Sequence, residues 1–204
     1  MHIAVAGNIG AGKTTLATKL AKHYRWEIYY ESVEDNPYLE DFYKDMERWA
    51  FHLQIFFLNS RINQVMQIRD SKKSVIQDRT VYEYANIFAK NLHISGFLNH
   101  RDYENYRRLF NSFKDLVKPP DLLIYLRANV STLVERIQKR GRKYEQNIQL
   151  NYLKNLGDHY EEWISNYKEG RLLVIDVNHL DFVQNPEDFG TIVSKVDREL
   201  FGLF

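Results

Sequence analysis

Five short apolar runs alternate along the chain with longer segments whose apolar residues recur at helical spacing. The apolar runs, at 3–6, 27–31, 74–77, 121–128 and 172–176, have the character of buried strands. Helical spacing covers 13–24, 38–45, 47–69, 81–92, 101–117, 130–140, 148–168 and 186–200. Strands alternating with helices predict an α/β fold, in which a five-stranded parallel β-sheet is flanked by helices on both faces.

The strand ends indicate where a ligand site would lie. In an open parallel sheet, ligands bind outside the carboxyl ends of the strands. The segments that follow residues 6, 30, 77, 128 and 176 are therefore expected along one edge. No repeat, low-complexity tract or long linker interrupts the pattern, so we expect one domain over 1–204.

The first of these segments, GNIGAGKTT at 7–15, fits the phosphate-binding pattern G-x-x-x-x-G-K-[ST]. Glycines permit positive φ, so successive backbone N–H groups can curve around phosphate oxygens. The lysine is expected to reach the outer phosphates and the following threonine to ligate Mg²⁺. The nucleotide-binding residues expected here are Gly7, Asn8, Ile9, Gly10, Ala11, Gly12, Lys13, Thr14 and Thr15.

Two acidic positions follow the second and third strands. Glu31 is placed to accept a proton from an attacking hydroxyl, although an ordinary acidic loop is the alternative. Asp78 is placed for a metal or its water, and Arg79 for the transferred phosphate, although an ion pair that caps the next helix is the alternative. The candidate metal ligands are Thr14, Asp78 and Glu31.

A basic segment, RIQKRGRKYEQ at 136–146, follows the fourth strand and its helix. A mobile arginine-rich segment can fold over the outer phosphates and stabilise the charge of a transition state, so we expect a lid at about 136–147. The alternatives are a solvated charge run or a nucleic-acid patch. The near balance of 28 Lys+Arg against 27 Asp+Glu disfavours a nucleic-acid or membrane-surface partner.

The remaining composition narrows the class of protein. The chain has no cysteine, which excludes a disulfide framework, a thiol nucleophile and a cysteine-ligated metal. The apolar runs are far shorter than the roughly 20 residues of a membrane span. A strand-like sequence from His2 leaves no room for a signal peptide. A cytoplasmic location is therefore expected.

Four motifs in order resemble one family. They are GNIGAGKTT, ESVEDNP at 31–37, DRTVYE at 78–83 and RGRKYEQNIQLNYL at 140–153, and together they are similar to the deoxyribonucleoside kinases. The bacterial deoxyadenosine/deoxyguanosine kinase branch is the most similar. The resemblance extends from His2 to about Phe182. It implies a P-loop kinase fold with an arginine-rich lid, and transfer of the γ-phosphate of ATP to the 5′-hydroxyl of a deoxyribonucleoside in nucleotide salvage. A purine is expected, deoxyadenosine most of all.

The resemblance also implies roles for individual residues. Glu31 matches the general base, while Arg79 matches the arginine that holds the 5′-hydroxyl and the developing charge. Gln54 matches the residue that meets the base edge, and Arg61, seven residues on, a second base reader. The implied set is completed by Lys13, Arg140 and Arg142 for the transition-state charge, Arg136 for the lid, Tyr43 and Glu145 for the 3′-hydroxyl, Phe88 for stacking, Leu39 and Leu53 for the pocket wall, and Asp181 and Phe182 for the donor adenine.

Three positions depart from the family pattern. Tyr84, which we include among the substrate-binding residues, stands where purine-preferring relatives often carry an aspartate that pairs with the base-reading arginine. Arg61 thereby lacks its usual partner, which bears on base preference. Tyr144 stands where relatives often have a glutamate, and Ser32 replaces a common proline, as in the bacterial branch.

Other functions share some of these features. A nucleoside monophosphate kinase such as a thymidylate kinase has the loop and lid but must bind an acceptor phosphate, which a carboxylate at Glu31 would repel. A pyrimidine deoxynucleoside kinase is a further alternative. Intact Lys13, Thr14, Glu31 and Arg79 disfavour an inactive nucleotide-binding subunit, and a GTPase lacks support because no N/T-K-x-D motif occurs. The resemblance further implies a homodimer and feedback inhibition by a deoxynucleoside triphosphate.

Overall fold

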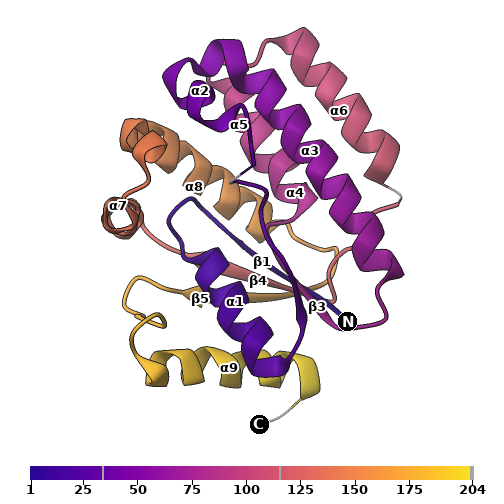
Figure 1. Cartoon of the computed structure of the whole chain (residues 1–204), viewed down its shortest axis with the longest axis vertical. Coiled ribbons are helices and arrows are strands. Elements are labelled where there is room, and N and C mark those ends of the chain that lie inside the picture. The colour runs from indigo at the N-terminus through magenta and orange to yellow at the C-terminus, as the bar shows by residue number, and fades with distance from the viewer. Residues whose placement is uncertain (34, 115, 203–204) are drawn as a thin grey trace.

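The computed structural model describes residues 1–33, 35–114 and 116–202, and within them five parallel strands form one sheet (Figure 1). The strands are β1 (His2–Gly7), β2 (Glu27–Tyr29), β3 (Val75–Asp78), β4 (Leu122–Arg127) and β5 (Arg171–Asp176). Their order is β2-β3-β1-β4-β5, so the phosphate loop leaves the central strand. The predicted parallel sheet is confirmed.

Helices cover both faces of the sheet, as the alternating pattern predicts (Figure 1). One face carries α1 (Lys13–Tyr24) and α9 (Pro186–Phe201). The other face carries α3 (Met46–Asp70), α4 (Val81–Glu83), α5 (Ala89–Ile94), α6 (His100–Lys114) and α8 (Leu150–Ser165). The short helix α2 (Leu39–Lys44) packs on α3, and α7 (Val130–Arg140) follows β4.

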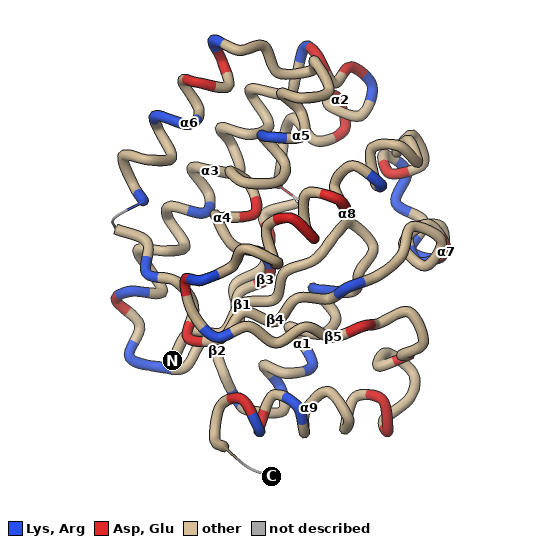
Figure 2. The backbone as a smooth tube through the Cα atoms, turned by 180° about the vertical axis from the view of Figure 1, so that it is seen from behind, with Lys and Arg blue, Asp and Glu red and all other residues tan. Residues whose placement is uncertain are grey.

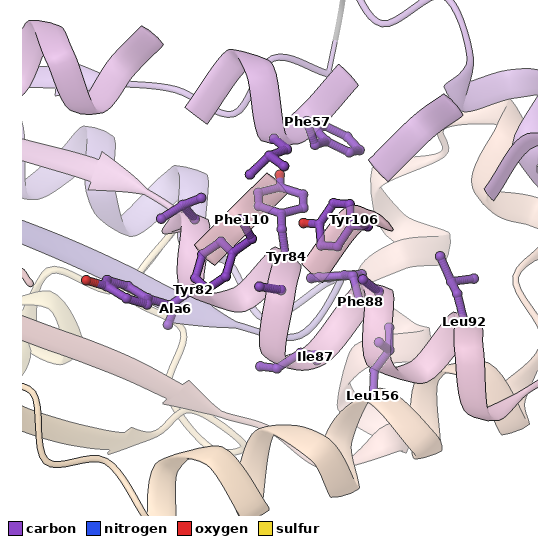
Figure 3. Close-up of a cluster of buried hydrophobic side chains, with 14 of the residues drawn as sticks. Ala6, Phe57, Tyr82, Tyr84, Ile87, Phe88, Leu92, Tyr106, Phe110 and Leu156 are labelled. Carbon is purple, nitrogen blue, oxygen red and sulfur yellow. The ribbon is translucent and has the colours of Figure 1, made fainter. Parts of the chain in front are cut away.

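The alternation of side chains along β1 builds both cores. Ile3 and Val5 face the cluster formed with α1 and α9, whereas Ala4 and Ala6 face the larger, aromatic-rich cluster on the other side. Figure 3 shows part of that larger cluster, in which Tyr84 and Phe88 stand among side chains of several helices. Because these four residues of β1 are fully buried, the strand is fixed from both faces and gives the loop after it a rigid base.

The structure differs from the expected elements at three places near the sheet edge. The second strand ends at Tyr29, so Glu31 lies in the loop beyond it, while Asp78 is the last residue of β3 rather than the first after it. The expected helix over 81–92 is divided, because a π-helical stretch over Tyr84–Phe88 separates α4 from α5. A π-helical turn widens a helix and re-aims its side chains, a local choice that apolar periodicity does not encode.

Other boundaries differ by a few residues. The expected helix 101–117 ends at Lys114, and position 115 lies outside the described residues. A 3₁₀ turn over Lys143–Asn147, which periodicity did not predict, precedes α8. Basic and acidic residues are interspersed along the chain (Figure 2). Within the described residues, every helix is too short or too polar to cross a membrane.

Candidate active site

The loop between β1 and α1 has a backbone that demands glycine. Gly10 and Gly12 have φ of 86° and 94°, in the left-handed region that side chains disfavour. There is also no room for a side chain at either position. A Cβ on Gly10 would lie 2.8 Å from the Leu133 carbonyl oxygen, and one on Gly12 would lie 2.8 Å from Cζ of Phe182. The loop therefore closes tightly around a position where backbone N–H groups can meet phosphate oxygens.

Lys13 is buried at the start of α1 and its ammonium group caps the loop. Its Nζ donates to the Asn8 carbonyl oxygen at 2.9 Å, while the Asn8 side chain donates to the Leu153 carbonyl oxygen at 2.9 Å. Burial and the positive charge of Arg79 lower the pKa of Lys13 to about 8, although Asp78 and nearby glutamates oppose the shift. An incoming phosphate would favour the charged form of the lysine and raise this pKa again.

Asp78 and Thr14 meet at the end of β3. The Thr14 hydroxyl donates to Asp78 Oδ2 at 2.5 Å, whereas Asp78 Oδ1 is buried without a partner within the described residues. Burial raises the pKa of Asp78, and the charge of Glu31 adds to that shift while Lys13 opposes it. An orphaned carboxylate oxygen beside a hydroxyl fits an oxygen-preferring cation such as Mg²⁺. No group of three His, Cys, Asp or Glu side chains gathers for a metal in the described ranges, so such a cation would depend on phosphate oxygens and water.

Glu31 and Arg79 form an ion pair at the same edge. Glu31 Oε1 lies 2.9 Å from Arg79 Nε and also accepts a hydrogen bond from the Tyr84 hydroxyl. Burial acts to raise the pKa of Glu31, but the charges of Arg79, Arg61 and Lys13 outweigh it and lower the pKa to about 2. The carboxylate is therefore ionised at any physiological pH and can accept a hydrogen bond from a hydroxyl group.

Arg79 is held from behind by a buried network that sequence reasoning missed. Arg79 itself has φ of 68°, which is strained for a non-glycine residue. Its Nη1 donates to the Tyr160 hydroxyl at 2.6 Å and approaches Glu83 at 3.3 Å. Glu83 is fully buried and accepts from the Thr80 backbone N–H at 2.7 Å and from Tyr160 at 2.8 Å. Thr80 and Glu83 form a capping box, T-x-x-E, and that spacing was the available signal.

A cavity of about 670 Å³ opens beside these groups. Gln54 is only 2% exposed, and its Oε1 accepts no hydrogen bond from any of the described residues. A buried amide oxygen without a partner is costly, which indicates that a ligand completes it. The predicted residues that line the cavity are Ile9, Gly10, Gly12, Lys13, Thr14, Thr15, Glu31, Leu39, Tyr43, Leu53, Gln54, Asp78, Arg79, Tyr84, Phe88, Arg140, Arg142 and Glu145. Tyr144 of the predicted lid also lines the cavity, and lining residues that the sequence did not suggest include Phe42, Phe57 and Tyr152.

The basic segment closes one side of this cavity. Arg140 pairs with Glu145 through two contacts, of 2.6 Å and 3.0 Å, and Arg142 lies 3.5 Å from the same carboxylate. Tyr144 stacks on Tyr43 with their ring centroids 5.9 Å apart. The two arginines thus stand at the cavity within the segment predicted as a lid, and the single buried carboxylate of Glu145 offsets only part of their positive charge.

Arg61 does not line this cavity in the structure, in contrast to Gln54, which lies seven residues or about two turns earlier on α3. Its side chain is 0% exposed. Its Nη1 donates to Gln64 Oε1 at 2.5 Å, and its guanidinium lies 5.5 Å from the centroid of the Tyr84 ring. The expected base reader therefore lies against Tyr84 and outside the cavity, with Gln64 as its hydrogen-bond partner.

A second cavity, of about 500 Å³, borders the other side of the phosphate loop at Gly10, Gly12 and Thr15. Its wall includes the predicted donor-binding residues Arg136, Arg140, Asp181 and Phe182. Arg136 links the phosphate loop to the segment after β5, because it donates to the Ala11 carbonyl oxygen at 3.2 Å and to the Val177 carbonyl oxygen at 2.6 Å. Arg136 thus supports the loop rather than reaching over it. Gly7, Asn8 and Ala11 line neither cavity and shape the backbone instead.

Known proteins similar to this chain are named as kinases of deoxynucleosides. The family model described as "Deoxynucleoside kinase" matches residues 3–201. The deoxyadenosine kinase of Dictyostelium discoideum is 43% identical over 192 residues, which cover 94% of this chain and 77% of that protein. The deoxyadenosine/deoxycytidine kinase of Bacillus subtilis (strain 168) is 36% identical over 198 residues, which cover 95% of this chain and 90% of that protein.

Solved structures of deoxyadenosine kinase from M. mycoides have the same fold. The structure with products dCMP and a flexible dCDP matches with a TM-score of 0.87 at 34% identity, and the match covers 97% of this chain and 99% of the other. The structure with bound dATP matches with a TM-score of 0.84 at 33% identity over the same shares. Sequence and backbone similarity therefore extend over nearly the whole of both chains.

Proposed function

This chain belongs to the deoxynucleoside kinase family, and on that premise we propose that it transfers the γ-phosphate of ATP to the 5′-hydroxyl of a purine deoxyribonucleoside. Deoxyadenosine is the preferred acceptor in this proposal, and the reaction serves nucleotide salvage in the cytoplasm. The observation that carries it is the 2.9 Å pair of Glu31 and Arg79 on one cavity with Lys13. The names of the similar kinases, several of them for deoxyadenosine, support the acceptor.

In the proposed reaction, Glu31 orients the acceptor hydroxyl and takes its proton. A carboxylate whose pKa is about 2 is a weak base. Phosphoryl transfer asks little covalent work of the protein, however, and depends chiefly on position and charge. Arg79 faces both the carboxylate and the reacting oxygens, so it holds the hydroxyl in line while the proton leaves.

Four cations stabilise the negative charge that develops on the transferred phosphoryl group: Lys13, Arg79, Arg140 and Arg142. Mg²⁺ would be held by Thr14 and Asp78. Within the described residues, Oδ1 of Asp78 has no hydrogen-bond partner, while its Oδ2 accepts from the Thr14 hydroxyl. That ion supplies charge neutralisation and orientation of the phosphates. Donor adenine would occupy the second cavity, beside Asp181 and Phe182.

The acceptor would lie along the first cavity. Gln54 offers one donor and one acceptor to the base edge, and Phe88 offers a face for stacking. Tyr43 and Glu145 would bind the 3′-hydroxyl, and the tyrosine beside the sugar disfavours a 2′-hydroxyl. Leu39 and Leu53 would supply the apolar wall that a nucleoside slot needs.

An acceptor panel tests this proposal. Purified protein with Mg-ATP would be given deoxyadenosine, deoxyguanosine, deoxycytidine, thymidine, adenosine, dAMP and dTMP, with Lys13→Met protein, prepared identically, as the control for contaminating kinases. We expect strong turnover of deoxyadenosine and little of adenosine. Deoxycytidine is included in the panel because a similar kinase is named for it. Turnover of monophosphates alone would overturn the proposal and favour a nucleoside monophosphate kinase.

We further propose feedback inhibition by a deoxynucleoside triphosphate, and the same geometry supports it. The two cavities meet at the phosphate loop, since Gly10, Gly12 and Thr15 line both. A triphosphate whose base enters the acceptor slot would place its phosphates on the loop, and a similar kinase has been solved with bound dATP. We expect inhibition competitive with both substrates, whereas inhibition unaffected by added ATP and nucleoside would contradict this arrangement.

A further inference from the structure

The position of Tyr84 in the cavity bears on base recognition. Its ring is stacked on Phe57 of α3 at a centroid distance of 4.8 Å and lies 5.7 Å from Phe88 (Figure 3). Its hydroxyl donates to Glu31 across 53 residues of sequence. The aromatic neighbours and the hydrogen bond of the hydroxyl together fix the orientation of the ring.

Arg61 adjoins that ring but does not line the cavity. The guanidinium is 5.5 Å from the ring centroid, within the range of a cation–π contact, and Arg61 is absent from the residues that line the cavity. Within the described residues its Nε and Nη2 are buried without a hydrogen-bond acceptor. The Arg61 cation is thus stabilised by the Tyr84 π face and by Gln64, and it is kept from the slot.

We propose that Tyr84 is a specificity-determining residue, because its ring separates the Arg61 guanidinium from the base slot and leaves the base edge to Gln54. This inference rests on the proposed function. A guanidinium is donor-only and fits guanine, whose O6 and N7 are both acceptors, whereas adenine presents an amino group in place of O6. Keeping Arg61 out of the slot therefore disfavours deoxyguanosine relative to deoxyadenosine.

The test is a cycle of four proteins: the unchanged chain, Tyr84→Leu, Arg61→Met and the double variant. For each, kcat/KM is measured for deoxyadenosine and for deoxyguanosine, and the ratio of the two cancels general losses of activity. Tyr84→Leu should shift the ratio toward deoxyguanosine by about tenfold or more. With Tyr84 retained, Arg61→Met should alter the ratio by less than about threefold. In the double variant, Arg61→Met should abolish the shift toward deoxyguanosine that Tyr84→Leu causes.

Tyr84→Phe is the matched control, since it keeps the ring and removes the hydrogen bond to Glu31. Its kcat is expected to fall for both nucleosides alike while the ratio stays unchanged. Thermal unfolding and calorimetric binding of both nucleosides to all five proteins would show that the shift does not come from misfolding. The binding ratio should follow the kinetic ratio.

Each other outcome overturns the inference. A large change of ratio in Arg61→Met alone would mean that Arg61 reads the base directly. A shift in Tyr84→Leu that survives Arg61→Met would mean that the ring itself selects the base, and a full shift in Tyr84→Phe would exclude separation by the ring. If the unchanged chain phosphorylated no deoxynucleoside, the proposed function would fail as well, so the two failures are distinguishable.

Discussion

At the scale of single residues, the candidate site is a group of charges that set one another's ionisation. Arg79 lies between Glu31 and Glu83, with contacts of 2.9 Å and 3.3 Å, and both partners are largely buried. Removing one partner of a buried ion pair leaves an uncompensated charge, which costs far more than the pair contributes. Neutral replacements that keep the shape are therefore the informative ones.

Glu31→Gln keeps the size of the side chain and removes its capacity to take a proton. We expect kcat for deoxyadenosine to fall roughly 10²- to 10⁴-fold, the range of general-base contributions, while nucleoside affinity measured by calorimetry changes little. Glu27→Gln, at the half-buried start of β2 and outside the cavity, is the matched control and should retain full activity. Unchanged turnover in Glu31→Gln would remove the residue from the role of base.

Lys13 makes nucleotide binding depend on pH. A lysine is charged below its pKa, and the pKa of Lys13 in the free protein is about 8. Phosphate binding favours the charged form, so the Kd for Mg-ATP should rise as pH increases between about 7 and 9, with proton uptake on binding. Titration calorimetry in buffers of different ionisation enthalpy measures both effects. Lys13→Met should bind more weakly and with a flat profile, and an equally steep profile in that variant would assign the dependence elsewhere.

At the scale of elements, the site depends on how loops leave rigid strands and helices. The phosphate loop packs tightly against two other segments, because the middle of α7 lies against Gly10 and the Phe182 loop lies against Gly12. The lid is different in kind. Arg140 and Glu145 are joined across the turn that follows α7, so the lid arginines are held near the cavity by their own segment.

Gly12→Ala tests that tight packing. The new methyl would meet the Phe182 ring at 2.8 Å in a backbone with φ of 94°. We expect a loss of about 1–3 kcal/mol in the free energy of unfolding and a raised KM for ATP. Gly190→Ala, in α9 with nothing within 4 Å of the added methyl, should be neutral or slightly stabilising. A Gly12→Ala protein with unchanged melting temperature and KM would contradict the tight loop.

At the scale of the whole molecule, we propose a homodimer, and two partly exposed apolar side chains on α3 and α6 suit its interface. Met66 of α3 is 37% exposed and Leu109 of α6 is 38% exposed, and the two helices pack on each other (Figure 1). Such residues suit an interface between long helices, as the family resemblance implies.

Sedimentation velocity should therefore find a species of about 49 kDa, twice the 24.4 kDa of one chain. Met66→Glu and Leu109→Glu should each weaken association, because they place a charge in an apolar interface. Gln67→Glu adds the same charge at an exposed neighbouring position and should not. A species of 24.4 kDa at every concentration would exclude the dimer.

The sequence by itself determined the features that are local or periodic. Alternating apolar runs and helical stretches predicted the parallel sheet, because burial on both faces of a strand requires such runs. The spacing of Gly7, Gly12, Lys13 and Thr14 predicted the phosphate loop, because its backbone admits few other residues. The order of the motifs also placed most of the residues that now line the first cavity.

Tertiary structure alone decided the contacts between distant segments. Glu83 meets Tyr160 across 77 residues, and Tyr84 meets Glu31 across 53, and neither pairing has a signature in spacing. The π-helical turn aims Tyr84, and the packing of α3 then places Arg61 against its ring. Whether a polar side chain reaches a cavity depends on which neighbour fills the intervening space, and that is settled when the core packs.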